Sequence, residues 1–499
     1  MAGPDADVAV VGCGPVGCTL AILLGQLGRR VVVLERWPEP YRLPRAVHMD
    51  HEVARIIQSC GVGEQLRAIS EPAHVYEWRN AAGTTLLRFG RVGDSASGWP
   101  ESLMFNQPML EELLDARAAE LSTVDVRRGV EVTGLAQGDD SVVLQTAGGA
   151  EVSARYVVGC DGANSTVRPL AGLPVHDLGF FFDWLIVDVV LDHPRVFDPI
   201  NVQICDPVRP TTAVSGGPGR RRWEFMRLPD ERIEDLNDVD RAWELLAPWD
   251  VHPGNARLER HAVYTFQART AAQWQVGRAF LAGDAAHQMP PFAGQGMCSG
   301  LRDAVNLAWK LDLVLDGSAP LDLLATYDEE RRPNATAAID FSVELGKVIC
   351  VPDPDEAAAR DDAMTAGYDG SVSEAPGLPG IESGLVAAGA PLAGELLPQA
   401  NLGGRWFDDV HGAGWRLVTV EAGGAATVDA DLVEWFATIG GAVVDVASAA
   451  ELTSWLAARE VGWVLQRPDF HLFGAAPDRA GAEALLVALR ARFDRAEVR

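Results

Sequence analysis

The sequence has little positive charge and little cysteine. Of its 499 residues, 42 are Lys or Arg and 70 are Asp or Glu, so the net charge is −28, and lysine occurs only at positions 310 and 347. Phosphate backbones and anionic lipid surfaces repel so negative a chain, and we expect neither nucleic acid nor a membrane as a partner. The 48% hydrophobic and 22% charged residues are typical of a globular protein. At roughly 150 residues per domain, the length predicts about three domains.

The seven cysteines are an odd number without paired spacing, at positions 13, 18, 60, 160, 205, 298 and 350. This pattern predicts neither a disulfide framework nor a metal cluster, so we expect no bound metal and a reducing, cytoplasmic location. One uncharged stretch, Val8–Gly28, could be mistaken for a membrane or export segment. Acidic residues precede it and glycines interrupt it, so we expect a buried strand and helix instead.

The chain opens on a predicted strand, helix and second strand, at residues 7–12, 15–28 and 31–35. The first turn reads Gly12-x-Gly14-x-x-Gly17. In such a turn the first glycine permits the tight bend, the second lets the backbone approach a pyrophosphate, and the third allows close helix–strand packing. Glu35 ends the second strand, where a carboxylate can accept hydrogen bonds from ribose hydroxyls. This unit predicts dinucleotide binding but does not choose between NAD and FAD.

Two later runs also place an Asp–Gly pair directly after a predicted strand. Asp161-Gly162 lies in "ARYVVGCDGANSTVR", and Gly283-Asp284 lies in "GRAFLAGDAAHQMPPFAGQGMCSGLRDAVNLAWKL". Together with the first motif, and in this order, they resemble the flavin-dependent aromatic hydroxylases of the 4-hydroxybenzoate hydroxylase type, the class A flavoprotein monooxygenases. The resemblance covers about residues 5–350. The runs "GQGMCSGLRDA", "QICDPVRP" and "RRWEF" are similar to the 3-(3-hydroxyphenyl)propionate hydroxylase group.

The resemblance implies an FAD site with separate residue roles. Glu35 would hold the adenosine ribose, Asp284 the ribityl and pyrophosphate region, and Arg45 and Gln107 the flavin edge or the phosphates. Asp161 would serve FAD and the nicotinamide donor, or would simply end a strand. Arg168 could bind the donor's phosphate or form an ion pair. The expected cofactor contacts are Gly12, Gly14, Pro15, Val16, Gly17, Glu35, Arg36, Arg45, Gln107, Asp161, Gly283, Asp284, Pro291, Gly294, Gly296, Met297 and Cys298.

The "PPFAGQGM" loop carries the expected catalytic residues, Pro291, Met297 and Cys298. Gly294 and Gly296 would let the backbone pass close to the flavin ring, and the N–H groups of residues 297 and 298 would begin a helix. A helix N-terminus stabilises the negative charge that appears on a reduced flavin. Cys298 is expected to be a small buried residue, with a redox-sensitive thiol as the alternative. His287 is expected to be structural, with proton transfer as the alternative.

Substrate recognition is expected in a strand-rich insertion. In "RRWEFMRL", strand alternation places Trp223 and Phe225 on one face and residues 222, 224 and 226 on the other. One face can pack a substrate ring, and the other can be solvent-exposed or a salt-bridge layer. Arg209 could meet a substrate carboxylate or pair with Asp206 or Glu224. Besides Arg209, the candidate substrate residues are Trp184, Gln203, Cys205 and Phe225, each equally open to a core role.

The expected fold class is α/β. A discontinuous Rossmann-type FAD-binding domain would cover residues 1–180 and 265–350, with a mixed β-sheet substrate domain inserted at 181–264. A linker with some local helix follows at 351–400, and residues 401–499 resemble a thioredoxin-like α/β domain. No cysteine follows Cys350, so disulfide chemistry is excluded there and a structural or oligomerising role remains. Arg467-Pro468-Asp469 is predicted to form a turn before the last strand.

The resemblance implies an oxygenation reaction. NADH or NADPH would reduce the bound FAD, the reduced flavin would capture O2 as a C4a-hydroperoxide, and one oxygen atom would pass to a phenolic ring. An alternative keeps this chemistry but directs it at a polyketide or antibiotic natural product. A third reading is a flavoprotein that acts only as a reductase or a sequestering protein. The expected partner is a small aromatic substrate, and a homodimer is left open.

Overall fold

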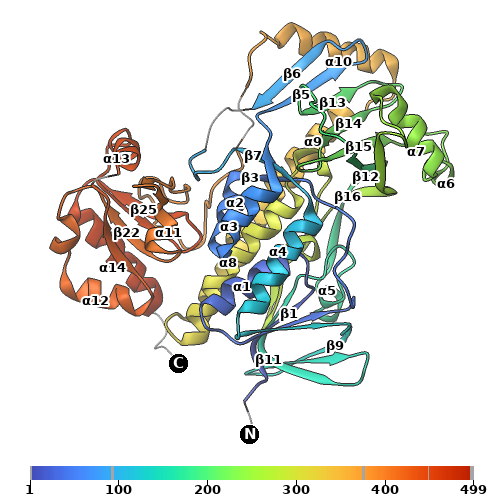
Figure 1. Ribbon diagram of the computed structural model, residues 1–499. Helices are drawn as coiled ribbons and strands as arrows, with labels where there is room; N and C mark the ends of the chain where they lie inside the picture. The colour runs from blue at the N-terminus through green and yellow to red at the C-terminus, as the bar shows by residue number, and fades with distance from the viewer. Residues whose placement is uncertain (1–2, 91–94, 374–376, 448, 495–499) are drawn as a thin grey trace.

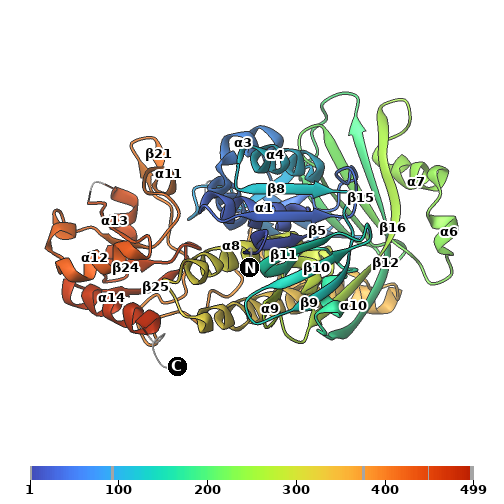
Figure 2. The ribbon, with the colours of Figure 1, turned by 90° about the horizontal axis from the view of Figure 1, so that it is seen from below.

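The computed structural model describes residues 3–90, 95–373, 377–447 and 449–494 (Figure 1). A central helical and sheet region carries a second sheet on one side and the C-terminal domain on the other (Figures 1 and 2). Within the described residues, no helix has both the length and the apolar character needed to cross a lipid bilayer.

The first sheet contains the predicted dinucleotide fold. Its main strands run in the order β17-β18-β11-β1-β2-β8, and β10 and β9 extend it from β11. The pairs β1–β2, β1–β11, β2–β8 and β11–β18 are parallel. The Val- and Ala-rich stretches of β1, β2 and β11 are buried, as expected for parallel strands covered on both faces, whereas β8 is partly exposed. The bounds are β1 Ala6–Val11, β2 Val31–Glu35, β8 Val124–Arg128, β9 Val132–Gln137, β10 Val142–Thr146, β11 Glu151–Gly159, β17 Gln275–Val276 and β18 Ala279–Leu281.

Helices surround the buried helix α8, Gly296–Asp316, which ends at the left-handed Gly317. Helix α1 packs against both α8 and α4, and α9 and α2 also contact α8. The short α5 follows the Asp161-Gly162 loop. The bounds are α1 Pro15–Gln26, α2 His51–Ile57, α3 Gly63–Ile69, α4 Gln107–Glu120, α5 Val167–Leu170 and α9 Ala325–Ile349.

The second sheet, called the roof sheet below, has the strand order β19-β16-β12-β15-β14-β13-β5-β6. Helices α6 (Ile233–Leu236) and α7 (Val239–Leu246) belong to the apolar cluster on its outer face. The strand bounds are β5 Val75–Asn80, β6 Thr85–Gly90, β12 Val175–Leu191, β13 Asn201–Cys205, β14 Thr211–Ser215, β15 Arg220–Met226, β16 Ala256–Ala271 and β19 His287–Gln288.

The roof sheet extends beyond its predicted boundaries of 181–264. Strand β12 begins before that range and β16 ends after it, and β5 joins the sheet by parallel pairing with β13. A small third sheet lies within residues 48–105, where β7 (Ser102–Phe105) pairs with β3 (His48–Asp50) and β4 (Ser70–Pro72). These pairings join distant segments, so local sequence periodicity did not reveal them.

The C-terminal domain has a mixed sheet of order β23-β22-β24-β25, in which only β22 and β23 are parallel among the described pairs. This agrees with the predicted α/β fold class. The linker carries α10, Pro354–Gly367, which contacts β6. The remaining bounds are β20 Asn401–Leu402, β21 Arg405–Trp406, α11 Phe407–His411, β22 Arg416–Thr419, α12 Ala430–Thr438, β23 Ala442–Asp445, α13 Ala450–Ala457, β24 Trp463–Gln466, β25 Leu472–Ala476 and α14 Arg479–Phe493.

Candidate active site

A cavity of about 870 Å³ connects the dinucleotide fold, the roof sheet and the C-terminal domain. Its lining begins at the start of α1, passes residues 45–52 and the loop before α8, and reaches strands β5, β13, β14 and β15. The predicted cofactor residues that line it are Gly14, Pro15, Val16, Arg45, Gln107, Asp284, Pro291, Gly294, Gly296 and Met297. The others lie outside the lining: Gly12, Gly17, Glu35, Arg36, Asp161, Gly283 and Cys298.

The three glycines of the first motif have different surroundings. Gly12 has φ +101°, and a Cβ there would lie 2.4 Å from the carbonyl oxygen of Cys160. A Cβ at Gly17 would lie 2.1 Å from the carbonyl oxygen of Gly12. At Gly14, by contrast, a Cβ would have no protein atom within 4 Å, and Gly14 lines the cavity at the N-terminus of α1. Space beside a helix N-terminus suits the pyrophosphate of a dinucleotide, so these residues fit FAD.

Glu35 holds the dinucleotide loop from the end of β2. Its carboxylate accepts hydrogen bonds from the backbone N–H groups of Cys13 and Trp37, both at 2.8 Å. The neighbouring Arg36 is exposed, and its guanidinium lies 5.3 Å from the centre of the Trp37 ring. Glu35 therefore organises the turn itself, and its contact with a ribose stays a prediction.

The Gly283-Asp284 loop is anchored by Asp303 of α8. One oxygen of Asp303 accepts from the Gly283 N–H at 3.0 Å and lies 2.7 Å from His287 Nε2, while the other accepts from Arg331 at 2.9 Å. Burial alone would raise the pKa of Asp303, but His287 and Arg331 bring it below its usual value. His287 is thus buried and held by Asp303, which agrees with a structural role, and that role stays a prediction. Asp284 opens onto the cavity, where the surrounding protein raises the pKa of its carboxyl.

Asp161 and Arg168 shape the loop after β11 rather than line the cavity. Asp161 accepts from the Ser165 hydroxyl at 2.6 Å and from the N–H groups of Thr166 and Val167 at 2.6 and 3.0 Å. Arg168 donates to the Ala285 carbonyl at 2.8 Å and thereby connects this loop to the Gly283-Asp284 loop. The adjacent Gly162 lines the cavity instead.

The loop before α8 brings its backbone to the cavity. Gly294 has φ +64°, and a Cβ there would lie 2.6 Å from His48 Nδ1. Helix α8 then begins at Gly296 without a side-chain cap, so its first N–H groups are free to face a ligand. Cys298 is fully buried outside the cavity lining, and burial raises the pKa of its thiol. This position favours the small buried cysteine over a reactive thiol.

Arg302 joins α8 to the segment that begins α2, a contact that the sequence analysis missed. Its guanidinium donates to Glu52 at 2.6 Å, Asp50 at 2.8 Å and Gln295 at 3.1 Å. All of these residues line the cavity. Burial would raise the pKa of Asp50, but Arg302 holds it well below its usual range. The carboxylates therefore stay charged and keep the loop before α8 attached to α2.

The inner face of the roof sheet differs from the predicted one. The alternation in β15 is as predicted, but Trp223 and Phe225 pack into the outer apolar cluster with α7. Arg222 and Glu224 face the cavity instead. Phe225 is therefore on the wrong side of the sheet to contact a substrate in this cavity. Alternation alone could not decide which face would be covered by α6 and α7.

The other predicted substrate residues lie behind the cavity wall. Trp184 is fully buried, with its ring centre 5.6 Å from that of the lining residue Phe292. The carbonyl of the buried Cys205 accepts from Arg360 of α10 at 2.6 Å. Arg209 pairs with Glu231 at 2.5 Å, so an ion pair forms, but with neither Asp206 nor Glu224 as expected.

Gln203 supports two lining residues that the sequence analysis missed. Its side-chain oxygen accepts from the hydroxyls of Thr212 at 2.7 Å and Tyr76 at 3.3 Å, and its amide nitrogen donates to the Thr211 carbonyl at 3.1 Å. Tyr76 and Thr212 both line the cavity. Tyr76 had no signal in the sequence, since β5 was not recognised as part of this sheet.

Arg222 ties the roof to the segment that carries Arg45. It donates to Asp188 at 2.7 and 3.0 Å and to the carbonyls of Arg45 at 2.6 Å and Pro44 at 2.9 Å. Arg45 lines the cavity, with its guanidinium 5.0 Å from the centre of the Tyr41 ring. Strand β15 therefore holds the backbone of Arg45, whose side chain was predicted to contact FAD.

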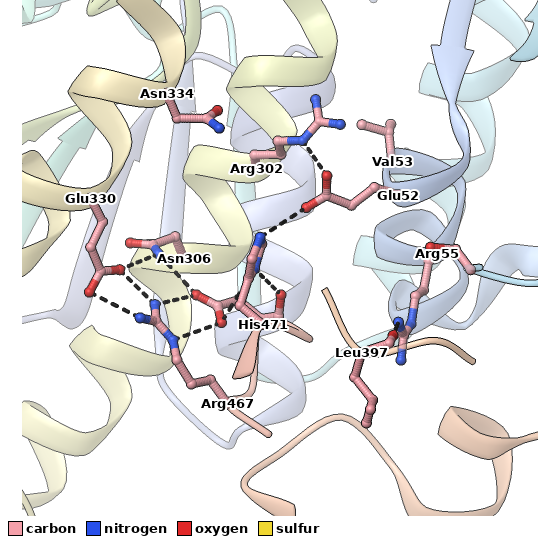
Figure 3. Close-up of polar contacts among 12 residues, drawn as sticks. Glu52, Val53, Arg55, Arg302, Asn306, Glu330, Asn334, Leu397, Arg467 and His471 are labelled. Atoms are coloured by element: carbon pink, nitrogen blue, oxygen red, sulfur yellow. Dashed lines mark hydrogen bonds and ion pairs between the residues drawn. The ribbon is translucent and has the colours of Figure 1, made fainter. Parts of the chain in front are cut away.

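The C-terminal domain also reaches the cavity (Figure 3). Arg467, in the predicted turn between β24 and β25, is fully buried and pairs with Glu330 of α9 and with Asp469, at 2.6 and 2.7 Å. His471, two residues beyond Asp469, lines the cavity and lies 3.8 Å from Glu52. The turn was predicted, but its buried contact with α9 was not.

Two cysteines whose spacing in the sequence did not suggest a pair lie close together in the structure. Cys13 Sγ and Cys18 Sγ are 3.2 Å apart, and with an oxygen of Asp115 they form a group that could hold a metal ion. Arg128 donates to Asp115 at 2.5 Å and already supplies a positive charge there. The sequence analysis missed this contact. Cys13 lies in the dinucleotide loop and Cys18 in the first turn of α1, and their spacing matches no common metal-binding motif.

A family model described as "FAD binding domain" matches residues 5–342. The chain belongs to this family. It is 39% identical over 497 residues to a probable NADH-specific resorcinol 4-hydroxylase of Rhodococcus jostii (strain RHA1), covering 95% of this chain and 92% of that one. It is 35% identical over 505 residues to a 3-(3-hydroxy-phenyl)propionate/3-hydroxycinnamic acid hydroxylase of Mycobacterium sp. (strain JLS), covering 96% and 85%.

Solved structures agree with the fold. The ternary complex of aklavinone-11 hydroxylase with FAD and aklavinone is 26% identical and superposes with a TM-score of 0.80, covering 99% of this chain and 100% of that one. The predicted family, the fold class and the FAD cofactor are thereby confirmed. The relatives also agree with the predicted enzyme class, an FAD-dependent aromatic hydroxylase.

Proposed function

We propose that this enzyme hydroxylates a small, uncharged phenol such as resorcinol, with FAD bound in the cavity, O2 as co-substrate and NADH or NADPH as electron donor. The continuity of the cavity supports this most directly. It joins Gly14 at the N-terminus of α1, the uncapped start of α8 and a roof that offers both aromatic and polar side chains. Cofactor and substrate can therefore occupy one continuous cavity.

Different parts of the chain would bind the cofactor, stabilise its charge and exclude water. When bound, FAD supplies the transfer of electrons from the nicotinamide and the activation of O2. The N–H groups at the start of α1 would bind its pyrophosphate, and those at the start of α8 would stabilise negative charge on its ring. The apolar lining, which includes Trp78, Met104 and Phe292, would exclude water from the reacting ring.

The charges of the cavity favour a phenol without a carboxylate. Three lining arginines already have carboxylate partners: Arg222 with Asp188, Arg302 with Asp50 and Glu52, and Arg331 with Asp303. The fourth lining arginine, Arg45, is the one predicted to contact FAD. An anionic side chain on the substrate would therefore lack a free buried cation among these residues. This is the reason for testing resorcinol before 3-(3-hydroxyphenyl)propionate.

A second candidate is a polycyclic natural product, since a solved relative holds aklavinone. A cavity of about 870 Å³ that must also hold FAD favours the smaller substrate. Steady-state NADH and NADPH oxidation by the FAD-loaded enzyme, with and without each phenol or aklavinone, distinguishes the two. Mass spectrometry under oxygen-18 should find one labelled oxygen atom in the product. Failure of every phenol to stimulate oxidation and yield a labelled product would refute the proposal.

A homodimer and a cytoplasmic location are kept as proposals. The absence of cysteine spacing typical of secreted scaffolds supports the location. Light scattering of the purified holoenzyme tests the oligomer, and cell fractionation of the native host tests the location. A monomeric mass, or recovery with the envelope fraction, would contradict the respective proposal.

A further inference from the structure

The roof of the cavity carries a buried carboxylate without a hydrogen-bond donor. Glu224, on β15, is 7% exposed and lines the cavity. Among the described residues, no side chain or backbone group donates a hydrogen bond to it, and the ion-pair partner Arg222 lies 3.8 Å away. Leaving a buried carboxylate without donors is costly, so native structures rarely do so. The position indicates a ligand that donates a hydrogen bond.

The hydroxyl groups and most N–H bonds beside Glu224 form their hydrogen bonds with other groups. Thr212 lies opposite Glu224 on the paired strand β14, but its hydroxyl donates to Gln203 at 2.7 Å. The Tyr76 hydroxyl also donates to Gln203. Four of the five N–H bonds of Arg222 point to Asp188 and to the carbonyls of residues 44 and 45. The unused acceptor capacity of Glu224 therefore faces the cavity.

Resting on the function proposed above, we propose that Glu224 accepts the hydrogen bond of the substrate's phenolic hydroxyl and acts as its base. One atom of O2, activated by the bound FAD, would form the new bond to the ring carbon, and the other atom would leave as water after the O–O bond breaks. In the same step the phenolic O–H bond breaks and the proton passes to a carboxylate oxygen of Glu224. The bonding electron pair stays on the phenolic oxygen and increases electron density at the ortho and para carbons. When the ring becomes aromatic again, it releases a ring proton to water, and the proton on Glu224 returns to the oxygen.

The same geometry defines the class of ligand at this end of the cavity. A phenol or another neutral donor is accepted, whereas a methyl ether has no proton to donate. A carboxylate at this position would lie against a second carboxylate and be repelled. Substrates that carry an acid group must therefore point it away from β15.

The test compares two ligands in each variant of the FAD-loaded enzyme. The Kd values of resorcinol and benzoate are measured from changes in flavin absorbance, in wild type and in Glu224→Gln. We expect the resorcinol Kd to rise about 10-fold, since the amide oxygen of Gln still accepts a hydrogen bond but lacks the negative charge that strengthens it. The benzoate Kd should fall or stay constant, so the ratio of the benzoate to the resorcinol Kd decreases. Glu231→Gln, which removes the partner of Arg209 outside the cavity, should leave the ratio unchanged.

Two further measurements complete the test. In wild type, 1,3-dimethoxybenzene should bind at least about 10-fold more weakly than resorcinol, a comparison that needs no folded variant. Equal binding would overturn the proposal. An unchanged Kd ratio in Glu224→Gln would overturn it too. Loss of FAD from this variant would also overturn it, since Glu224 would then contact the flavin rather than the substrate. If wild type itself hydroxylates no phenol, the proposed function fails, while the binding comparison still reports on Glu224.

Discussion

Single residues around the dinucleotide loop separate the requirements of folding from those of binding. Gly12 and Gly17 face backbone atoms of the protein itself, whereas Gly14 faces the cavity. All three occupy one short motif, and their spacing suggested their roles. The distances to surrounding atoms give those roles a physical basis, because only a filled space forbids a Cβ on steric grounds.

A Cβ at these glycines should have different effects. Gly14→Ala should leave the free energy of unfolding of the apoprotein nearly unchanged, since nothing lies within 4 Å of the added atom. It should raise the Kd for FAD about 10-fold or more, because the methyl group occupies the approach of the pyrophosphate. Gly17→Ala should instead destabilise the fold by about 1–3 kcal/mol through overpacking. Urea unfolding and FAD titration of both apoproteins check this, and equal effects in both assays would contradict it.

Strand β15 has a different function on each face. Its outer residues pack under α7, and its inner residues face the cavity and hold residues 44 and 45. The strand and its alternation were predictable from "RRWEFMRL". The orientation was not, since it depends on α6 and α7, which follow β15, and on pairing with distant strands.

Replacement of Arg222 should test whether β15 holds residues 44 and 45 in place. Arg222→Met removes the hydrogen-bonding partner of the buried Asp188, leaving only Arg260 at 3.9 Å, and removes donors to the carbonyls of residues 44 and 45. An uncompensated buried charge should cost about 3–5 kcal/mol, and the Kd for FAD should rise because Arg45 loses its position. The neighbouring Arg220→Met serves as control, since Arg220 is part-exposed and its ion pair with Glu259 spans 3.4 Å. Urea unfolding and FAD titration measure both; a variant as stable as the control would argue against this role.

At the scale of the whole molecule, the C-terminal domain is attached by buried charges. Arg467 binds Glu330 of α9, and Arg55 of α2 donates to Asp408 at 2.6 and 2.9 Å. These contacts lie beside His471, which reaches the cavity (Figure 3). The domain therefore completes the site, a structural role that agrees with its lack of cysteine.

Loss of Arg467 should weaken this attachment. Arg467→Met leaves Asp469 without its main partner and should lower the free energy of unfolding by about 3–5 kcal/mol. Limited proteolysis between α10 and β20 should become faster in the holoenzyme. Arg459→Met, an exposed position in the same domain, should behave like wild type. Unchanged proteolysis and stability in Arg467→Met would show that other contacts suffice.

The ion pair of Arg467 with Glu330 should make the free energy of unfolding sensitive to acid. Burial would raise the pKa of Glu330, but Arg467 and Lys310 hold it well below its usual value. A lowered folded-state pKa contributes stability above the unfolded pKa, about 4.3 for glutamate, and this contribution is lost as the pH falls further. Urea unfolding from pH 7 to pH 3 should therefore lose stability below about pH 4.3. Arg467→Met should lose less over this range, and an identical decline would exclude Glu330 as a major contributor.

The sequence by itself determined the dinucleotide unit, the three motifs, the FAD family and the overall α/β class. Each of these depends on residues close together in the chain, whose spacing is set by local backbone geometry. Only the tertiary structure decided that β5 brings Tyr76 to the roof, that Glu224 rather than Phe225 faces the cavity, and that Arg467 binds α9. These contacts join residues far apart in the chain, and burial selects them only when all layers are assembled.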